Sequence, residues 1–324
     1  RSMKSNLLKV LLTAVLILIA LSFSACQAQT FDQNIDPSGI EPDAKSTSTP
    51  EPTLTAVPTK TPQPTSTSLP SPTPTVVLSP EPIEVSVTLE DGSVISGKFY
   101  PGKINPAPVA VVFPWADGDQ EDWVEIAGWI QNRGLVFDDG NRSPWLSENW
   151  FPEKSEGPVM SVFTVNFREC TGGCTSWLSS AWVEDAHRAI ETAAELHGVD
   201  AERVVTMGTS IGADAAVEAC SWLNQSGKGR CHGFFAVSPG SYLTIPYDQT
   251  VVRLKEQDPD ITMFCAFARR DDAAWETCES APDEQLIDFG YVQLHGMELF
   301  QPGLQQNLLA EVDRFLIEAV PPLP

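Results

Sequence analysis

The segment VVTMGTSIGADAAV, residues 204–217, places a serine between two glycines where a β-branched run gives way to an alanine-rich run. The G-x-S-x-G spacing predicts a sharp strand-to-helix turn, in which Gly208 and Gly212 allow tight packing and the Ser210 hydroxyl stands clear of the backbone. The following helix would offer the Ile211 N–H to a developing negative charge. The same pentapeptide also suits a plain turn with a helix cap, so a nucleophilic serine needs partners elsewhere.

Histidine is the usual base for such a serine, and the chain has four histidines. His295 follows the last apolar strand-like run, in the segment YVQLHGMELF, and is expected on a loop that can reach Ser210. His187 and His197 fall on the predicted helix before the serine, and His232 opens a predicted strand. Structural or surface roles are expected for those three, so His295 is the predicted base.

Predicted strands and helices alternate along the chain, which favours a mainly parallel sheet with helices on both faces. Parallel sheets present their functional sites at the carboxyl ends of strands. An antiparallel hairpin turning at Asp91-Gly92 opens this region. The predicted elements are a hairpin over 82–102, a strand and loop over 108–118, a helix over 121–134, an irregular stretch over 138–158, a strand over 159–167, a helix over 176–198, a strand over 204–207, a helix behind Ser210, strands over 233–239, 261–268 and around 291–294, and a helix over 304–320.

Residues 83–319 resemble the α/β-hydrolase superfamily, and within it the dienelactone-hydrolase-like and prolyl-oligopeptidase-like esterases. The segments LEDGSVISGKFYP, FPWADGDQEDW, DAERVVTMGTSIGADAAV and LHG match in chain order. The resemblance implies an α/β-hydrolase fold with a mainly parallel central sheet, helices on both faces and an N-terminal antiparallel hairpin. It also implies catalysis by a serine, an acid and a histidine in that order, with no cofactor and no metal.

The acid is expected where the strand ITMFCAFA ends, in the segment RRDDAAW. Loops of the superfamily usually place the aspartate three residues after a small residue that closes the strand, and the spacing from Ala268 to Asp271 fits. Asp271 is therefore the predicted acid, which would fix the tautomer of His295 and stabilise its imidazolium form. Asp272 remains an alternative, because a shift of one residue in the loop would exchange the two.

The resemblance also places a second oxyanion donor in the loop after the strand VAVVF. Relatives usually carry His-Gly there, whereas this chain has Pro114-Trp115. Because the donor is a backbone N–H, Trp115 can serve together with Ile211, although its indole must be accommodated. This departure affects the expected substrate more than the expected reaction.

Further residues at the predicted carboxyl edge are candidates for substrate contact, namely Trp177, Tyr242 and Met297. Aromatic walls favour an apolar acyl or aryl group, and plain core packing is the alternative for each residue. The tryptophan-rich insert DDGNRSPWLSENWFPEKSEGP, residues 138–158, is expected on the far side of the sheet because it lies between a helix and the start of a strand.

Seven cysteines are present, and six remain if Cys26 carries a lipid. An even number in an exported chain suggests disulfides, and clustering favours three local pairs, although other pairings among the fifteen possible stay open. Metal binding is the weaker alternative, because no C-x-x-C pair or nearby histidine pair completes a tetrahedral set. The favoured pairs are Cys170 with Cys174, Cys220 with Cys231, and Cys265 with Cys278.

Residues 1–26 are predicted to be a lipoprotein signal peptide, with a basic start, the apolar run VLLTAVLILIALSF and the ending FSAC at Cys26. Cleavage would leave Cys26 as a lipid-modified N-terminus anchored to a membrane outside the cytoplasm. A transmembrane anchor and an ordinary secreted protein are alternatives, and the apolar run is short for a span. Residues 27–82, rich in Thr, Pro and Ser, are predicted to be a disordered linker, which leaves 83–324 as one α/β-hydrolase domain.

Acidic residues outnumber basic ones by 43 to 20, for a formal charge of -23. Nucleic acid is therefore not an expected partner, since phosphate binding needs a basic patch. The predicted function is an exported serine hydrolase that cleaves a small carboxylic ester through an acyl-enzyme. A peptidase or acyltransferase on the same triad, and a non-catalytic binding lipoprotein that kept the fold, are the alternatives.

Overall fold

The computed structural model describes residues 81–134, 143–154 and 157–320. All of them belong to the second of two units in the chain, residues 70–324. The predicted signal peptide, Cys26 and all but the last two residues of the predicted linker lie outside this part. None of the helices in these ranges has the length and apolar character that crossing a membrane requires.

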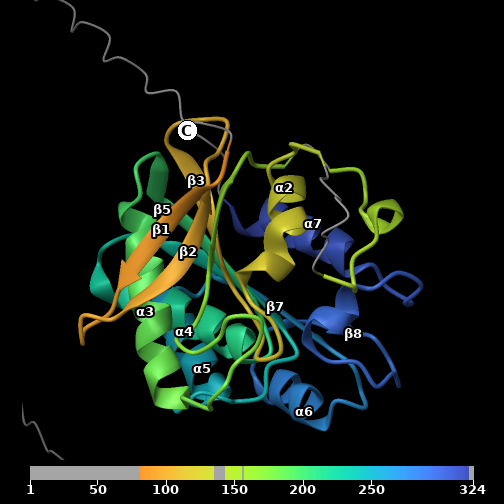
Figure 1. Cartoon of the computed structure of the whole chain (residues 1–324). Helices are drawn as coiled ribbons and strands as arrows, with labels where there is room; N and C mark the ends of the chain where they lie inside the picture. Colours follow the sequence, from red (N-terminus) through yellow and green to blue (C-terminus); the bar gives the residue numbers. More distant parts are fainter. Residues whose placement is uncertain (1–80, 135–142, 155–156, 321–324) are drawn as a thin grey trace, which may run out of the picture. The chain divides into compact units, whose positions relative to one another are not determined.

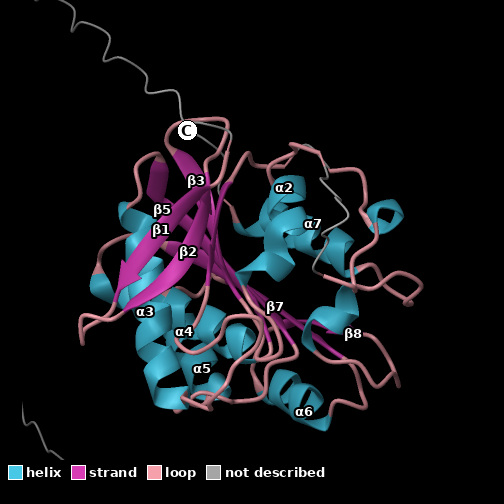
Figure 2. Cartoon of the chain, viewed as in Figure 1, coloured by secondary structure: helices cyan, strands magenta, loops and turns pink. Residues whose placement is uncertain are grey.

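Eight strands form one mixed sheet, and they are β1 (Ile83–Thr88), β2 (Val94–Tyr100), β3 (Ala107–Phe113), β4 (Ser161–Val165), β5 (Val199–Thr209), β6 (Cys231–Val237), β7 (Thr262–Phe267) and β8 (Gln285–Asp288). The strand order is β1-β2-β4-β3-β5-β6-β7-β8. Figures 1 and 2 show the sheet with its covering helices. The β1-β2 hairpin and the β2-β4 pair are antiparallel, and all pairs from β4 to β8 are parallel. Parallel strands bring their carboxyl ends to one edge of the sheet.

Within the described ranges, six α-helices pack around the sheet, and they are α2 (Val124–Ile130), α3 (Ser179–Glu195), α4 (Ile211–Ser226), α5 (Tyr247–Gln257), α6 (Asp272–Ser280) and α7 (Leu308–Ala319). In the described residues there are also three short 3-10 helices, η1 (Gln120–Trp123), η2 (Glu148–Trp150) and η3 (Gly296–Phe300). Helices α3, α4 and α5 cover one face of the sheet, and α2 and α7 cover the other (Figure 1).

The side-chain period of a strand divides the core between these faces. In β3, Val109 and Val111 belong to the cluster that contains α3, α4 and α5, whereas Ala110 and Val112 belong to the cluster that contains α2 and α7. Every residue of β3 is buried, as expected of a strand covered on both faces. A mainly parallel sheet with helices on both faces and an N-terminal hairpin is thus confirmed.

Two details differ from the sequence expectations. The last strand is β8 and not the run at 291–294, because Gly290, at φ 75°, turns the chain and Tyr291 points to solvent against Arg269. Helices α5 and α6 are absent from the sequence expectations. Helix α6 buries only Ala274 and Cys278, which gives it little apolar periodicity. Helix α5 buries Tyr247, Thr250, Val251 and Leu254 at the spacing of one helix face, and this signal was missed.

Candidate active site

Ser210 occupies the turn between β5 and α4. Its backbone has φ 56° and ψ -122°, the strained conformation expected of a nucleophile elbow. A Cβ on Gly208 would collide with the carbonyl of Gly212, and a Cβ on Gly212 would lie 2.5 Å from the carbonyl oxygen of Phe113. The two glycines are therefore required by close backbone approach. The Ser210 N–H donates to the Val237 carbonyl at 2.8 Å, which ties the turn to β6.

His295 lies on the loop after β8 and joins Ser210 to Asp271 by hydrogen bonds. Its Nε2 is 2.8 Å from Ser210 Oγ, and its Nδ1 is 2.6 Å from Asp271 Oδ2. The His295 N–H donates to the Glu298 carboxylate at 2.8 Å, and the next N–H, of Gly296, donates to Ser238 Oγ at 3.0 Å. The first bond closes the turn that follows His295, and the second holds the histidine loop against the end of β6.

Asp271 follows β7 and is the residue immediately before α6. Its N–H donates to the Ala268 carbonyl at 3.0 Å, and its own carbonyl accepts from the Trp275 N–H at 2.9 Å. Asp272 begins α6 and is exposed to solvent. Of the two adjacent carboxylates, the structure therefore brings Asp271 to the histidine and leaves Asp272 at the surface.

The predicted oxyanion donors lie on neighbouring segments at the same edge. Phe113, at the end of β3, pairs with Gly208 of β5, so the loop that continues into Trp115 runs beside the start of α4. As the first residue of α4, Ile211 has no acceptor for its N–H within the helix. The Trp115 indole is buried at 7% exposure and donates to Asp122 Oδ2 at 2.9 Å. Burial raises the pKa of the Asp122 carboxyl above its usual range.

The three candidates for substrate contact have different surroundings. Trp177 is 57% exposed, and its ring lies edge-on to Tyr242 at 5.9 Å between centroids. Tyr242 in turn lies edge-on to the His295 ring at 6.3 Å. Met297 is fully buried in the cluster that contains α2 and α7, because η3 turns its side chain inward, which is the core-packing alternative for this residue.

Asp214 was not among the residues that the sequence pattern singled out. It lies in the first turn of α4, is almost completely buried, and accepts backbone N–H bonds from Gly240, Tyr242 and Leu243. Burial raises its pKa to about 7 despite these bonds, which act in the opposite direction. Asp214 thus holds the loop that carries Tyr242. The signal that could have found it is an ionisable residue within the alanine-rich segment IGADAAV.

The tryptophan-rich insert approaches the site more closely than expected. Trp145 lies edge-on to Trp115, with 6.0 Å between ring centroids. Leu146, the next residue, is buried in the core cluster of α2 and α7, so the insert packs against the face of the sheet that these helices cover. Residues 138–142 and 155–156 of the insert lie outside the described part of the chain.

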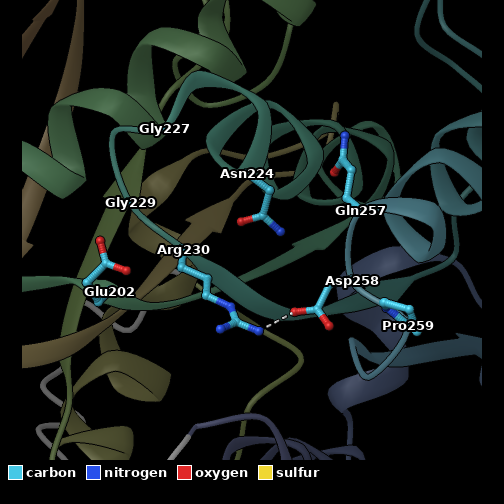
Figure 3. Close-up of a pocket in the computed structure, with 8 residues that line it drawn as sticks. All are labelled: Glu202, Asn224, Gly227, Gly229, Arg230, Gln257, Asp258 and Pro259. Carbon is cyan, nitrogen blue, oxygen red and sulfur yellow. Dashed lines mark hydrogen bonds and ion pairs between the residues drawn. The ribbon is translucent and has the colours of Figure 1, made fainter. Parts of the chain in front are cut away.

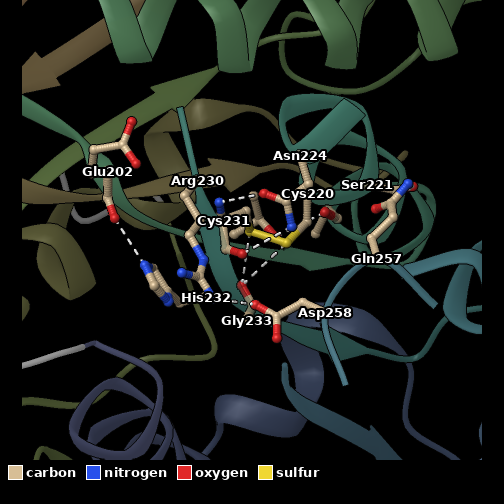
Figure 4. The surroundings of a disulfide bond; sticks show 12 residues. Glu202, Cys220, Ser221, Asn224, Arg230, Cys231, His232, Gly233, Gln257 and Asp258 are labelled. Carbon is tan, nitrogen blue, oxygen red and sulfur yellow. Dashed lines mark hydrogen bonds and ion pairs between the residues drawn. A yellow bond between two sulfur atoms is a disulfide. The ribbon is translucent and has the colours of Figure 1, made fainter. Parts of the chain in front are cut away.

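A cavity of about 550 Å³ lies at the opposite edge of the sheet (Figure 3). Its lining comes from the start of β5, the end of α4 and the segments before β6 and β7. Two of the lining residues, Arg230 and Asp258, form an ion pair at 2.9 Å. The Cys220–Cys231 disulfide joins α4 to β6 beside it (Figure 4). Because this edge holds the amino ends of the parallel strands, the cavity is separate from Ser210.

Three disulfides are present, and their pairs are Cys170 with Cys174, Cys220 with Cys231, and Cys265 with Cys278. Such a set favours an extracytoplasmic location, since cytosolic thiols are kept reduced. Within residues 81–134, 143–154 and 157–320, no three His, Cys, Asp or Glu side chains are grouped as a metal site would require.

Solved structures share this architecture at low sequence identity. The α/β hydrolase GrgF from Penicillium sp. sh18 is 12% identical, with 74% of this chain and 99% of that chain covered and a TM-score of 0.50. A dienelactone hydrolase from Anabaena variabilis is 11% identical, with 75% and 99% covered and a TM-score of 0.47. An esterase from Pyrococcus furiosus is 15% identical, with 74% and 94% covered and a TM-score of 0.48.

No family model matches the chain, and a search of curated proteins finds no match. The structural likeness establishes the fold and no more: this is an α/β-hydrolase fold. What the chain does must be argued from its own residues.

Proposed function

We propose that this protein is a serine hydrolase that cleaves carboxylic esters, with Ser210 as nucleophile, His295 as general base and acid, and Asp271 as the residue that orients His295. The observation that carries the proposal is the unbroken chain of hydrogen bonds, 2.8 Å from Ser210 to His295 and 2.6 Å from His295 to Asp271. A serine on a strained turn with a base and an orienting acid in reach is the arrangement that nucleophilic acyl transfer needs.

In the proposed reaction, His295 Nε2 takes the Ser210 proton as Oγ attacks the ester carbonyl carbon. The backbone N–H groups of Ile211 and Trp115 stabilise the oxyanion of the tetrahedral intermediate. His295 then gives the proton to the departing alcohol, which leaves an acyl-enzyme on Ser210. Water, deprotonated by His295, attacks the acyl-enzyme, and His295 returns this proton to Ser210 Oγ as the carboxylic acid is released. Asp271 stabilises each imidazolium form.

The substrate proposed is a small ester with an apolar acyl or aryl group. Tyr242 borders His295 and continues into the exposed ring of Trp177, and aromatic surfaces of this kind bind apolar groups. Rates on matched p-nitrophenyl esters, anilides and esters with a competing alcohol acceptor separate an esterase from a peptidase and an acyltransferase. Dominant hydrolysis of the esters is expected.

A fluorophosphonate probe tests the chemistry directly, because it reacts covalently with an activated serine. The wild-type protein should be labelled and Ser210→Ala should not, with both folded by circular dichroism. An unlabelled wild type would contradict a catalytic role and favour a binding protein with the same fold.

Anchoring at Cys26 is a further part of the proposal. The FSAC sequence supports it, and the three disulfides support export from the cytoplasm. The mature chain is expected to begin at Cys26 and to fractionate with membranes, and Cys26→Ser should be released or left unprocessed. A soluble wild type with another N-terminus would rule out the lipid anchor.

A further inference from the structure

The Trp115 indole lies between two loops of the candidate site. Its own backbone belongs to the loop after β3 that offers an oxyanion donor. On the other side, a Cβ on Gly296 would come within 2.8 Å of ring atom Cε3 of Trp115, so the ring packs against the residue directly after His295. The same flat side chain therefore touches the donor loop and the histidine loop.

The orientation of the indole is set by a buried acceptor. Trp115 Nε1 donates to Asp122 Oδ2 at 2.9 Å. Asp122 lies in η1, which directly follows the loop after β3. A Cβ on Gly118 would collide with both the Nε1 atom and the Oδ2 atom, so a glycine at this position leaves room for the bond. Hydrogen bonds to a carboxylate are stronger than those between neutral groups.

We infer that the Trp115 side chain is a positioning group, anchored by Asp122, that holds the oxyanion loop and the His295 loop in register. The backbone N–H and the indole of Trp115 share one Cα, so fixing the ring on two sides also limits the direction of that N–H. Misplacing such a group by about 1 Å lowers a rate by about 10²-fold. The inference rests on the proposed function, and it accounts for a tryptophan where relatives carry a glycine.

The test compares kcat and KM for p-nitrophenyl butyrate across matched variants. Trp115→Phe keeps an aromatic ring and removes the N–H, and Asp122→Ala removes its acceptor. Both should lower kcat by about 10- to 100-fold and leave KM within about threefold, since an oxyanion donor acts in the transition state. Asp122→Asn retains an acceptor oxygen and should keep most of the wild-type kcat.

Trp129→Phe is the control, because it also removes an indole hydrogen bond, to a backbone carbonyl away from Ser210. Trp129 lies in α2, and its indole donates to the Pro152 carbonyl at 3.0 Å. The melting temperature of the Trp129→Phe variant should fall, and its kcat should stay unchanged. A trifluoromethyl ketone, which forms an oxyanion on the serine, should lose affinity for Trp115→Phe in proportion to kcat/KM.

Suppose that the wild type hydrolyses esters and reacts with fluorophosphonate. If Trp115→Phe then has the same kcat as Trp129→Phe, the positioning role of Trp115 is overturned and the proposed function stands. A wild type that neither hydrolyses esters nor reacts with fluorophosphonate would overturn the proposed function and this inference with it. If Trp115→Phe does not fold, the Asp122→Ala and Asp122→Asn pair decides, and equal kcat values for the two overturn the role of the anchor.

Discussion

At the scale of single residues, the clearest contrast is between Asp271 and Asp272. They are adjacent in the chain, yet Asp271 ends the loop after β7 with its carboxylate on His295, whereas Asp272 has entered α6 and faces solvent. A carboxylate at an exposed helix N-terminus contributes about 0.3–1 kcal/mol to stability through the helix dipole. The Asp271 carboxylate, which is hydrogen-bonded to His295, is proposed to act instead on catalysis.

Replacing each aspartate in turn separates these roles. Asp271→Asn should lower kcat by about 10⁴-fold, because an amide favours the wrong histidine tautomer, and Asp272→Asn should change kcat by less than about twofold. Both variants are assayed on one ester after circular dichroism shows that they are folded. Activity lost in Asp272→Asn and kept in Asp271→Asn would mean that the acid has been assigned one residue too early.

At the scale of elements, the Cys170–Cys174 loop supports the loop after β3. Three N–H groups of the disulfide loop donate to residues 116–119, which follow Trp115. The bonds run from Cys174 to the Ala116 carbonyl (2.7 Å), from Gly173 to the Gly118 carbonyl (3.1 Å) and from Gly172 to the Asp119 carboxylate (2.8 Å). The loop after β3 is thus held in two ways, by the disulfide loop that bonds to residues 116–119 and by the packed ring of Trp115.

Removing this disulfide should lower both the stability and the rate. The double variant Cys170→Ser, Cys174→Ser should lose about 2 kcal/mol of stability, from closure of a short loop, and about tenfold in kcat. The double variant Cys220→Ser, Cys231→Ser should lose about 3 kcal/mol with kcat unchanged, since that bridge lies at the opposite edge (Figure 4). Urea unfolding and ester kinetics give both quantities, and an equal kcat in the two variants would contradict the prediction.

At the scale of the whole molecule, two buried carboxyls link folding to pH. Burial raises the pKa of Asp214 from 3.8 to about 7 and that of Glu284 from 4.5 to about 8. Glu284 accepts from the Tyr247 hydroxyl at 2.7 Å, which only partly offsets the loss of hydration. Because the folded state binds these protons more tightly than the unfolded state, their contribution to stability is full below about pH 4 and is lost as pH rises through about 7 and 8.

Neutral variants should therefore flatten the pH dependence of unfolding. Between about pH 5 and pH 8, the free energy of unfolding of Asp214→Asn and of Glu284→Gln should each fall less than that of the wild type, by on the order of 2 kcal/mol. Urea titrations at several pH values measure this, with the exposed Asp272→Asn as control. Parallel curves for wild type and Asp214→Asn would show that this carboxyl titrates normally.

Local pattern was sufficient for most of the elements and for the turn that carries Ser210, although it misplaced β8 and missed α5 and α6. The change from β-branched residues to alanines, with glycines on both sides of Ser210, places the strand, the turn and the helix without tertiary information. The hairpin at Gly92 and the alternation that predicts a mainly parallel sheet are equally local. These features depend on the side-chain period and on backbone freedom at a few positions, and a sequence carries both directly.

Only the tertiary structure decided which residues meet. Ser210 and His295 are 85 positions apart, and whether Asp271 or Asp272 reaches the histidine depends on where α6 begins, which short apolar stripes do not specify. The inward turn of Met297, the position of β8 and the fit of the Trp115 ring beside Gly296 likewise depend on packing between distant segments. Each is fixed by close packing and burial across the sheet edge, where neighbours in space are not neighbours in the chain.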